Sequence, residues 1–438
     1  MVSFLDTFSG FGTPLAILIA SVFFAFQALQ MGILAWLYGR GRARGHSPAL
    51  LLPVLNLAME CLWPQIFPSH ISDGLHAAPM LIQIVDLGGT YLLSALVSLV
   101  NGAFAALVIA KLTKQTLPRL APALAAVSLG LTLAYGAYRI GEVDARARTA
   151  RTLHVGMVQV NMGTYAKRED PREGHRRHLE QSRTLERLAE PDLIVWPESG
   201  YTDLVPDLPN VRRYVTQDIT TPVLFGGLSM RRRDDARHLF NTAFLLDADG
   251  DVLGSYDKTY LVPFGEFIPF GDVFPSLYEL SPNTGHFTPG DHVRPVVLDG
   301  IRMSLLVCYE DVIPAFTRRA VREGNPHLLV NLTNDAWYGD THEPWIHLAL
   351  AKFRAVEHHR ALVRSTNSGV SAFVDPVGRV IANSQVFTRE ELDARLPLLT
   401  GHTVYETVGD QWAWLFVAIA LYAAFGRART KRDAPTPA

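Results

Sequence analysis

Long uncharged apolar stretches dominate the first third of the chain and return near its end. A helix needs about 20 apolar residues to cross a hydrocarbon core of about 30 Å. Residues 12–38 carry no charged side chain and are long enough to cross with tilt. The pattern predicts helical membrane segments within residues 1–140 and one more near the C-terminus, at about 12–38, 48–68, 88–110, 118–138 and 411–427.

Three basic clusters flank these segments: RGRARG at 39–44, KLTKQTLPR at 111–119 and GRARTKR at 426–432. Lys and Arg collect on the cytoplasmic side of a membrane. All three clusters share that side if the N-terminus is outside and five helices alternate. The region 140–410 then lies outside the cytoplasm, and the tail 428–438 lies inside.

Glu60 interrupts the second apolar segment. An ionisable side chain within a membrane segment is a functional candidate by default. The alternative is a carboxylate near a helix end or paired within the helical bundle. The sequence leaves both interpretations open.

Between the apolar segments, residues 151–400 alternate short β-rich runs with amphipathic stretches. This alternation predicts an α/β layered domain, large enough to bury a full core. Strands are expected at 153–160, 192–196, 222–229 and 327–333, strand pairs within 241–256, 293–308 and 361–380, and helices at about 170–190, 210–219, 311–323 and 341–361.

Composition narrows the class of protein further. Charged residues make up 19% of the 438 residues, whereas soluble domains carry about 25%. The formal net charge of -2 gives no indication of a nucleic-acid partner. The only cysteines are Cys61 and Cys308, so neither a disulfide framework nor a Cys-rich zinc site can be built.

Cys308 ends the apolar run MSLLVC, where a helix is expected to begin. Free backbone N–H groups and the helix dipole at such a junction favour the thiolate, the nucleophilic form of cysteine. An inert buried cysteine is the alternative. Thiols outside the cytoplasm are usually paired, and this one has no partner there, which favours a reactive role.

Two charged residues follow other predicted strands. Glu198 lies in WPESG after a short strand, where enclosure would raise its pKa toward that of a general base. Lys258 follows the predicted hairpin, and its ammonium could stabilise an oxyanion. Glu266, eight residues later, could orient Lys258. A surface glutamate and a solvated lysine remain the alternatives for these positions taken singly.

Several long motifs occur together and in order. WPES, KTYLVPFGEFIP, VCYEDV, NDAWYGD and RALVRSTNSG resemble the nitrilase superfamily, and within it the membrane-embedded apolipoprotein N-acyltransferase family. MLIQIVDLGGTYLLSALVSLVN extends the resemblance into the membrane part.

The resemblance implies an αββα sandwich joined to a transmembrane helical bundle. It also implies a catalytic triad with Glu198 as base, Lys258 as oxyanion stabiliser and Cys308 as nucleophile. Glu266 matches a further pocket glutamate of the family, and Tyr309 and Glu310 match positions beside its nucleophile. No cofactor and no metal are implied.

The implied reaction moves an acyl chain from a phospholipid to Cys308, and then to the α-amino group of a diacylglyceryl-cysteine on an apolipoprotein. The implied location is the bacterial inner membrane, with the catalytic domain on the periplasmic side. A membrane-anchored amidase of the same superfamily and a non-catalytic short variant of the acyltransferase are the competing interpretations.

The sequence departs from the family in two places. The family usually has eight membrane helices, and five are predicted here, so a short variant or a late start codon is expected. A tryptophan that often follows the first domain strand is absent, and Tyr165 is the nearest aromatic residue.

Two further segments have more than one possible interpretation. The apolar run 269–280, with Phe270 and Phe274, is either a lipid-facing lid or a loop packed on the core. HEPWIH at 342–347 resembles a zinc motif, but histidines five apart do not share a helix face, so no metal is expected.

Overall fold

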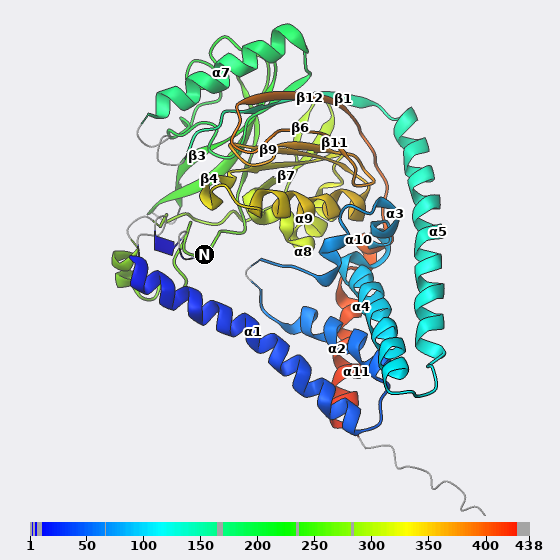
Figure 1. Ribbon diagram of the computed structural model, residues 1–438. Helices are drawn as coiled ribbons and strands as arrows, with labels where there is room; N and C mark the ends of the chain where they lie inside the picture. Colours follow the sequence, from blue (N-terminus) through cyan, green and yellow to red (C-terminus); the bar gives the residue numbers. More distant parts are fainter. Residues whose placement is uncertain are drawn as a thin grey trace, which may run out of the picture.

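The computed structural model describes residues 2, 5–6, 11–65, 67–163, 170–233, 236–281 and 284–426. Tyr165 and the tail 428–438 lie outside the described residues. The chain forms a layered α/β domain, and a group of long helices extends from one side of it (Figure 1).

Two six-stranded sheets form the centre of the α/β domain. The first has the strand order β12-β1-β2-β3-β4-β5, and the second has the order β11-β10-β9-β8-β7-β6. The strands of the first sheet are β1 (Thr152–Gln159), β2 (Leu193–Val195), β3 (Val223–Arg233), β4 (Ala236–Leu246), β5 (Val252–Asp257) and β12 (Glu390–Pro397). Those of the second are β6 (Val296–Leu298), β7 (Ile301–Val307), β8 (Leu328–Thr333), β9 (Ala361–Thr366), β10 (Ala372–Val374) and β11 (Val380–Asn383).

Three apolar layers hold the sheets and their helices together. Val155 of β1 and Val330 of β8 belong to one buried cluster, which fills the space between the two sheets. The helix α7 (Pro171–Leu188) packs on the outer face of the first sheet. The helices α8 (Pro314–Gly324) and α9 (Glu343–His358) pack on the outer face of the second. The predicted αββα sandwich is confirmed.

Helices occur at all five predicted apolar segments. Three are long and apolar enough to cross a membrane: α1 (Thr13–Ala43), α4 (Val85–Leu112) and α5 (Leu120–Thr149). Two are shorter: α2 (Pro48–Leu62), and the segment Gln411–Phe425 that comprises η6 and α11. The short helices η2 (Ile71–Leu75) and α3 (Pro79–Ile82) connect α2 to α4, while α10 (Val404–Val408) precedes η6 (Gln411–Ala413) and α11 (Trp414–Phe425). That all five cross a bilayer stays a prediction.

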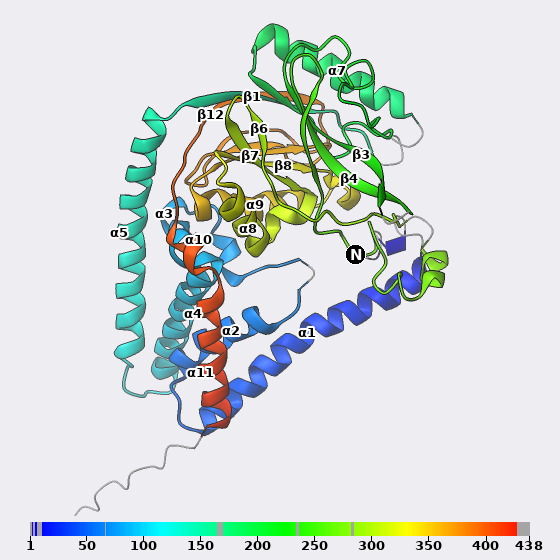
Figure 2. The ribbon, with the colours of Figure 1, turned by 180° about the vertical axis from the view of Figure 1, so that it is seen from behind.

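The basic end of α1, the basic α4–α5 connection and the described end of α11 lie on one side of the molecule. The C-terminal ends of α1 and α11 and the α4–α5 connection lie at the end farthest from the sheets (Figure 1, Figure 2). Arg40 donates to the carbonyl of Ala424 at 3.3 Å, and Arg44 to that of Gly426 at 3.3 Å. This arrangement agrees with the single cytoplasmic side that the charge clusters predict.

Glu60 lies in the last turn of α2 and is paired locally. Its Oε1 accepts hydrogen bonds from Asn56 Nδ2 at 3.1 Å and from the Ile71 backbone N–H at 2.9 Å. Of the two interpretations, the structure favours a carboxylate near a helix end that is paired within the bundle.

A buried junction joins the helical part to the α/β domain. Asp86 of α4 accepts hydrogen bonds from Arg139 Nε of α5 at 2.7 Å and from the His359 ring, which follows α9, at 2.9 Å. Gly89 has a φ of 67°, and a Cβ there would lie 2.6 Å from the Tyr405 ring. The kink in α4 therefore requires glycine because α10 packs against it.

The structure corrects one prediction for the domain and adds one strand. Turns occupy 212–218 within the predicted helix 210–219, so no helix forms there. The carbonyl of Val211 accepts from the backbone N–H groups of both Tyr214 and Val215, and Gln217 at φ 51° ends the helical geometry. The strand β12, which pairs antiparallel with β1, was not predicted.

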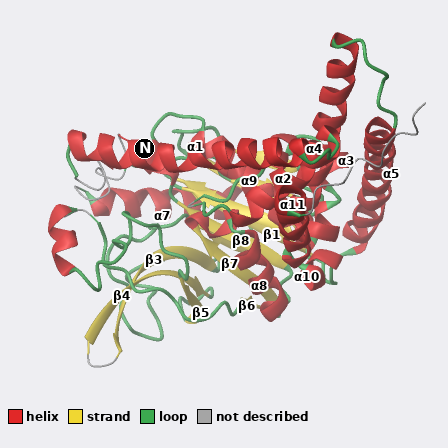
Figure 3. Ribbon diagram, turned by 90° about the horizontal axis from the view of Figure 1, so that it is seen from below, coloured by secondary structure: helices red, strands yellow, loops and turns green. Residues whose placement is uncertain are grey.

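In the view from below α1 crosses the domain (Figure 3), but only its N-terminal end lies near the domain, and the helix slants away toward the end farthest from the sheets (Figure 1). Phe11, just before α1, contacts Phe264 with ring centroids 6.0 Å apart. The underside of the domain therefore faces the apolar helices.

Candidate active site

Three strand ends bring the predicted catalytic residues together. Glu198 follows β2, Lys258 follows β5 directly, and Cys308 follows β7 as the first residue of η4 (Cys308–Val312). All three side chains are buried. The ionisation of Cys308 is electrostatically coupled to both Glu198 and Lys258, so the three groups share one site.

Lys258 is paired with two carboxylates. Its Nζ lies 2.8 Å from Glu266 Oε2 and 3.4 Å from Glu198 Oε1. Asn241 Nδ2 donates to Glu198 Oε1 at 2.8 Å and to Glu266 Oε1 at 2.9 Å. Asn241 was not identified from the sequence. The signal that could have identified Asn241 is its polar side chain within the mostly apolar run FNTAFLL of β4.

Burial and the neighbouring charges together determine the protonation of these groups. Burial raises the pKa of Glu198, Lys258 opposes this shift, and Glu266 adds to it. Burial alone would lower the pKa of Lys258, but Glu266 and Glu198 outweigh burial and raise it well above the ordinary value. Lys258 is therefore a fixed cation, and Glu198 is a carboxylate with the raised pKa that a general base needs.

Cys308 has a φ of 54°, the left-handed region that only a few non-glycine residues occupy. Asn331 Nδ2 of β8 donates to the Cys308 carbonyl at 2.8 Å and helps to hold this turn. Such strain is concentrated at functional sites.

The expected thiolate at Cys308 is corrected by the structure. Burial raises the pKa of Cys308 well above its usual value, and the negative charge of Glu198 raises it further, while Lys258 only partly opposes both. The thiol is therefore neutral at rest, and its attack on a carbonyl requires a base. The strand-end position was predicted correctly, but burial and the negative charges of Glu198 and Glu266 also act on the thiol and raise its pKa.

Glu310 links the nucleophile turn to the segment after Lys258. Its Oε1 accepts from the Thr259 N–H at 2.7 Å and the Tyr256 hydroxyl at 2.8 Å, and its Oε2 accepts from the Val307 N–H at 2.7 Å. Burial raises the pKa of Glu310 to about 7. Glu310 thus holds Lys258 and Cys308 in register.

Aromatic side chains connect the helical part to the nucleophile turn and lie exposed on the 269–280 segment. Tyr309 contacts Phe67 of the α2–η2 connection edge to face, with ring centroids 5.9 Å apart. Phe270 and Phe274 are 76% and 58% exposed, next to the short helix η3 (Pro275–Leu280). Of the two interpretations of 269–280, this exposure favours the lipid-facing loop over packing on the core.

A second set of charged residues lies behind the nucleophile. The support cluster consists of Asp311, Asp335, His347 and Arg364, all buried. Arg364 donates to Asp311 at 2.8 Å and to Asp335 at 3.0 Å. The His347 ring lies 2.8 Å from Asp311 and 3.1 Å from Asp335. Arg364 also donates to Asn331 Oδ1 at 2.8 Å, so the cluster reaches the Cys308 carbonyl.

The two histidines of HEPWIH have different surroundings, as their spacing predicted. His342 is exposed before α9, and His347 is buried in the support cluster. Ligand atoms of Asp335, Glu343 and His347 do lie within 4.8 Å of one another. Arg364 already supplies a positive charge to Asp335 there, and the absence of a metal stays a prediction.

Sequence comparisons cover both parts of the chain. Residues 154–403 match the carbon-nitrogen hydrolase family, and residues 1–103 match the N-terminal domain of apolipoprotein N-acyltransferases. The apolipoprotein N-acyltransferase of Geobacter metallireducens is 30% identical over 415 residues, which are 93% of this chain and 79% of that protein. That of Bdellovibrio bacteriovorus is 29% identical over 432 residues, 91% of this chain and 77% of that protein.

Among solved structures, an amidase of Nesterenkonia from the nitrilase superfamily matches 56% of this chain and 90% of its own. The TM-score is 0.41 and the sequence identity 21%. The family matches to both parts, the Geobacter relative and the order of Glu198, Lys258 and Cys308 at three strand ends all lead to one conclusion. The chain belongs to the apolipoprotein N-acyltransferase family.

Proposed function

We propose that this protein transfers an acyl chain from a membrane phospholipid to the N-terminal amine of a diacylated apolipoprotein, through a thioester on Cys308. One observation carries the proposal. A neutral thiol, a glutamate with a raised pKa and a fixed ammonium share one buried site in a domain that is joined to long apolar helices.

In the first half-reaction, Glu198 takes the proton of the Cys308 thiol as the sulfur attacks the ester carbonyl of the phospholipid. The Lys258 ammonium stabilises the oxyanion that forms. The ester C–O bond breaks, and the leaving alkoxide of the lysophospholipid takes the proton from Glu198. The acyl chain remains on Cys308 as a thioester.

In the second half-reaction, the lipoprotein amine attacks the thioester carbonyl. An α-amino group has a pKa of about 7.7–8.0, so only its neutral fraction is reactive near pH 7. Glu198 takes a proton from the attacking nitrogen, the C–S bond breaks, and the Cys308 sulfur recovers a proton from Glu198. The enzyme returns to its starting protonation, and the product is an amide.

Charge and polarity support one orientation of the protein in the membrane. The basic helix ends gather opposite the α/β domain, which favours a cytoplasmic location for them and an extracytoplasmic location for the active site. In a bacterium this corresponds to the inner membrane with a periplasmic catalytic domain. Phe270 and Phe274 then face the bilayer from which both substrates come.

The test uses the purified full-length chain with an alkyne-tagged phospholipid and a synthetic diacylated lipopeptide. The wild type should acquire the label, and lipopeptide should remove it as an amide product. Cys308→Ala should abolish both signals, whereas Cys61→Ala, the matched control, should retain both.

Each other outcome excludes part of the proposal. Label released only as free fatty acid would favour the amidase interpretation, because water would then replace the amine. Absence of label on folded wild-type protein would favour a non-catalytic variant. Label retained in Cys308→Ala would exclude the thioester.

A further inference from the structure

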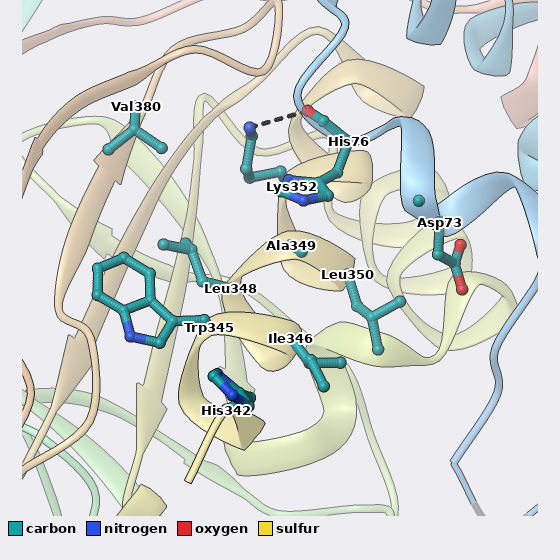
Figure 4. Close-up of a pocket in the computed structure, with 11 residues that line it drawn as sticks. Asp73, His76, His342, Trp345, Ile346, Leu348, Ala349, Leu350, Lys352 and Val380 are labelled. Atoms are coloured by element: carbon teal, nitrogen blue, oxygen red, sulfur yellow. Dashed lines mark hydrogen bonds between the residues drawn. The ribbon is translucent and has the colours of Figure 1, made fainter. Parts of the chain in front are cut away.

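A hollow lies on the outer side of α9, apart from the catalytic residues. This pocket has a volume of about 520 Å³, within the range of small-molecule sites. It is lined by η2, by α9 and by Val380 of β11 (Figure 4). Glu198, Lys258, Glu266 and Cys308 are not among its lining residues.

The pocket lies at the junction between the helical part and the domain. Ser72 of η2 donates from its hydroxyl to the Thr90 carbonyl of α4 at 3.2 Å, so one wall is fixed to a long apolar helix. The other wall is α9, whose His347 belongs to the support cluster on the nucleophile side. A ligand here would therefore touch both parts without touching Cys308.

The polar end of the pocket holds an unbalanced positive charge. Lys352 is 8% exposed, and its Nζ donates to the His76 carbonyl at 2.9 Å (Figure 4). Among the described residues no carboxylate oxygen lies within 4.0 Å of this ammonium. Burial lowers the pKa of Lys352, and Asp375 opposes the shift only from a distance. A buried ammonium without a close counter-ion is costly, and an anion beside it would remove that cost.

A second polar atom at the same end lacks a partner. His76 Nδ1 is buried and makes no hydrogen bond within the described part of the chain. Buried polar atoms are nearly always bonded, so an orphaned nitrogen near an ammonium without a close counter-ion indicates a site for a hydrogen-bonding ligand. A phosphate group has the charge for Lys352, and its oxygen atoms can accept from His76 in the tautomer that carries a proton on Nδ1.

The rest of the lining is open and mostly apolar, apart from His342 and Asp73 (Figure 4). Trp345 and Ile346 of α9 are 41% and 56% exposed, and Leu350 lies between Ile346 and the η2 side (Figure 4). Tryptophan and lysine together are typical of the membrane–water interface. Free phosphate would leave this apolar surface in water, whereas a lipid would cover it.

We propose that this pocket binds a glycerophospholipid that does not react, with its phosphate at Lys352 and His76 and an acyl chain along Trp345 and Ile346. The orientation of the site toward the bilayer rests on the proposed function. The lipid bridges η2 and α9 and so ties the membrane helices to the element that carries His347.

The test uses the full-length protein in detergent and an ether-linked phosphatidylglycerol with brominated chains. Ether bonds cannot acylate Cys308, and bromine quenches only tryptophans that it touches. The chain has 7 tryptophans, so Trp345→Phe isolates the contribution of the pocket. Saturable quenching is expected in the wild type, and Trp345→Phe should lack that component.

Two variants probe the two ends of the pocket. Lys352→Gln should raise the lipid concentration for half quenching about tenfold, because a charge-assisted hydrogen bond is lost. Ile346→Glu should weaken binding while leaving Lys352 intact. Lys111→Gln, an exposed lysine at the opposite end of the molecule, is the matched control and should titrate like the wild type. Unchanged thermal unfolding midpoints establish that the variants are folded.

Several results would overturn the assignment. If Lys352→Gln and the wild type reach half quenching at the same lipid concentration, Lys352 does not bind the phosphate. If Trp345→Phe shows the same quenching as the wild type, the acyl chain does not lie along Trp345. Inorganic phosphate that displaced all of the lipid at millimolar concentration would mean a simple anion site. Cys308→Ala should keep the quenching, so loss of acyl transfer and loss of this site are distinguishable.

Discussion

Two buried clusters of charged residues lie on either side of the Cys308 turn, and their charge balance differs. The active-site cluster has the carboxylates of Glu198 and Glu266 but one cation, Lys258. The support cluster pairs Asp311 and Asp335 with two cationic groups, Arg364 and His347.

This difference in charge balance gives the two clusters different roles, one catalytic and one structural. In the support cluster Asp311 and Asp335 are matched by Arg364 and His347, so these four residues act as a brace, while Glu343 lies 3.8 Å from His347 at the edge of the cluster. In the active-site cluster the carboxylates exceed the cations, and burial raises the pKa of Glu198 because its charge is incompletely compensated. A proton can therefore move to and from Glu198, which catalysis requires.

Removal of the general base, Glu198, should have the largest effect on the reaction rate. Glu198→Gln keeps the size of the side chain and an oxygen for Asn241, but it cannot accept the thiol proton. The rate of Cys308 acylation should fall by about 10²–10⁴-fold, the usual contribution of a general base. Rapid labelling with tagged phospholipid measures this rate.

Glu323→Gln is the control, because that carboxylate forms an exposed ion pair with Arg319. A Glu198→Gln variant that acylates at the wild-type rate would place the base elsewhere.

The next largest effect is expected on stability. Arg364→Met leaves Asp311 and Asp335 with an uncompensated buried charge, and the free energy of unfolding should fall by about 3–5 kcal/mol. Arg389→Met removes only an exposed pair with Glu180 and should cost at most about 1 kcal/mol. Denaturant unfolding, followed by a signal from the α/β domain, measures the free energy of unfolding of both variants. Equal losses in the two variants would mean that the support cluster does not brace the fold.

His347 gives the support cluster a defined pH dependence. Burial and Arg364 lower its pKa, but Asp311 and Asp335 outweigh them and raise it to about 10 from 6.5. Because the folded pKa exceeds the unfolded one, the stabilisation is complete below pH 6.5 and is lost as pH rises toward 10.

The measurement is the unfolding free energy between pH 6.5 and 10. The wild type should lose stability across this window relative to His347→Gln, which cannot titrate. His402→Gln, at an exposed position, should follow the wild type. Parallel curves for the wild type and His347→Gln would show that His347 is neutral in the folded protein.

The strand ends that carry the catalytic residues could be predicted from the sequence, but the charge balance of the two clusters could not. Glu198, Lys258 and Cys308 follow apolar strands, and such strands can be predicted from periodicity. The neutral thiol could not be predicted in the same way, because burial depends on how distant segments pack. Asn241, which bridges the two carboxylates, contacts residues 43 and 25 positions away.

Similar physical reasons explain why the strand β12 and the turns at 212–218 were not predicted. In β12, EELDARLP, burial alternates between half-buried and exposed positions along most of its length, and the strand lies at a sheet edge. It therefore lacks the apolar run that marked the central strands. The segment 211–219 carries apolar residues at helical spacing, Val211, Val215 and Ile219, but contacts with the hairpin at Gly250 override that local preference.

The smallest effect is expected where neither cluster is touched. Phe270→Ser with Phe274→Ser removes exposed apolar surface and should slow acylation from phospholipid vesicles about tenfold. The unfolding midpoint should stay the same because both rings are exposed. Leu188→Ser, exposed on α7, is the control and should leave the rate unchanged. A drop in midpoint that accounts for the lost rate would assign these rings to packing.

The protonation of Cys308 at rest can be observed directly. In Cys61→Ala protein the only remaining thiol is Cys308, so its infrared S–H stretch can be observed without overlap from another thiol. At pH 7 the band should be present, because burial and Glu198 keep the thiol neutral, and it should vanish in Cys61→Ala/Cys308→Ala. A missing band in folded Cys61→Ala protein would mean a resting thiolate, and Glu198 would not be needed to take its proton.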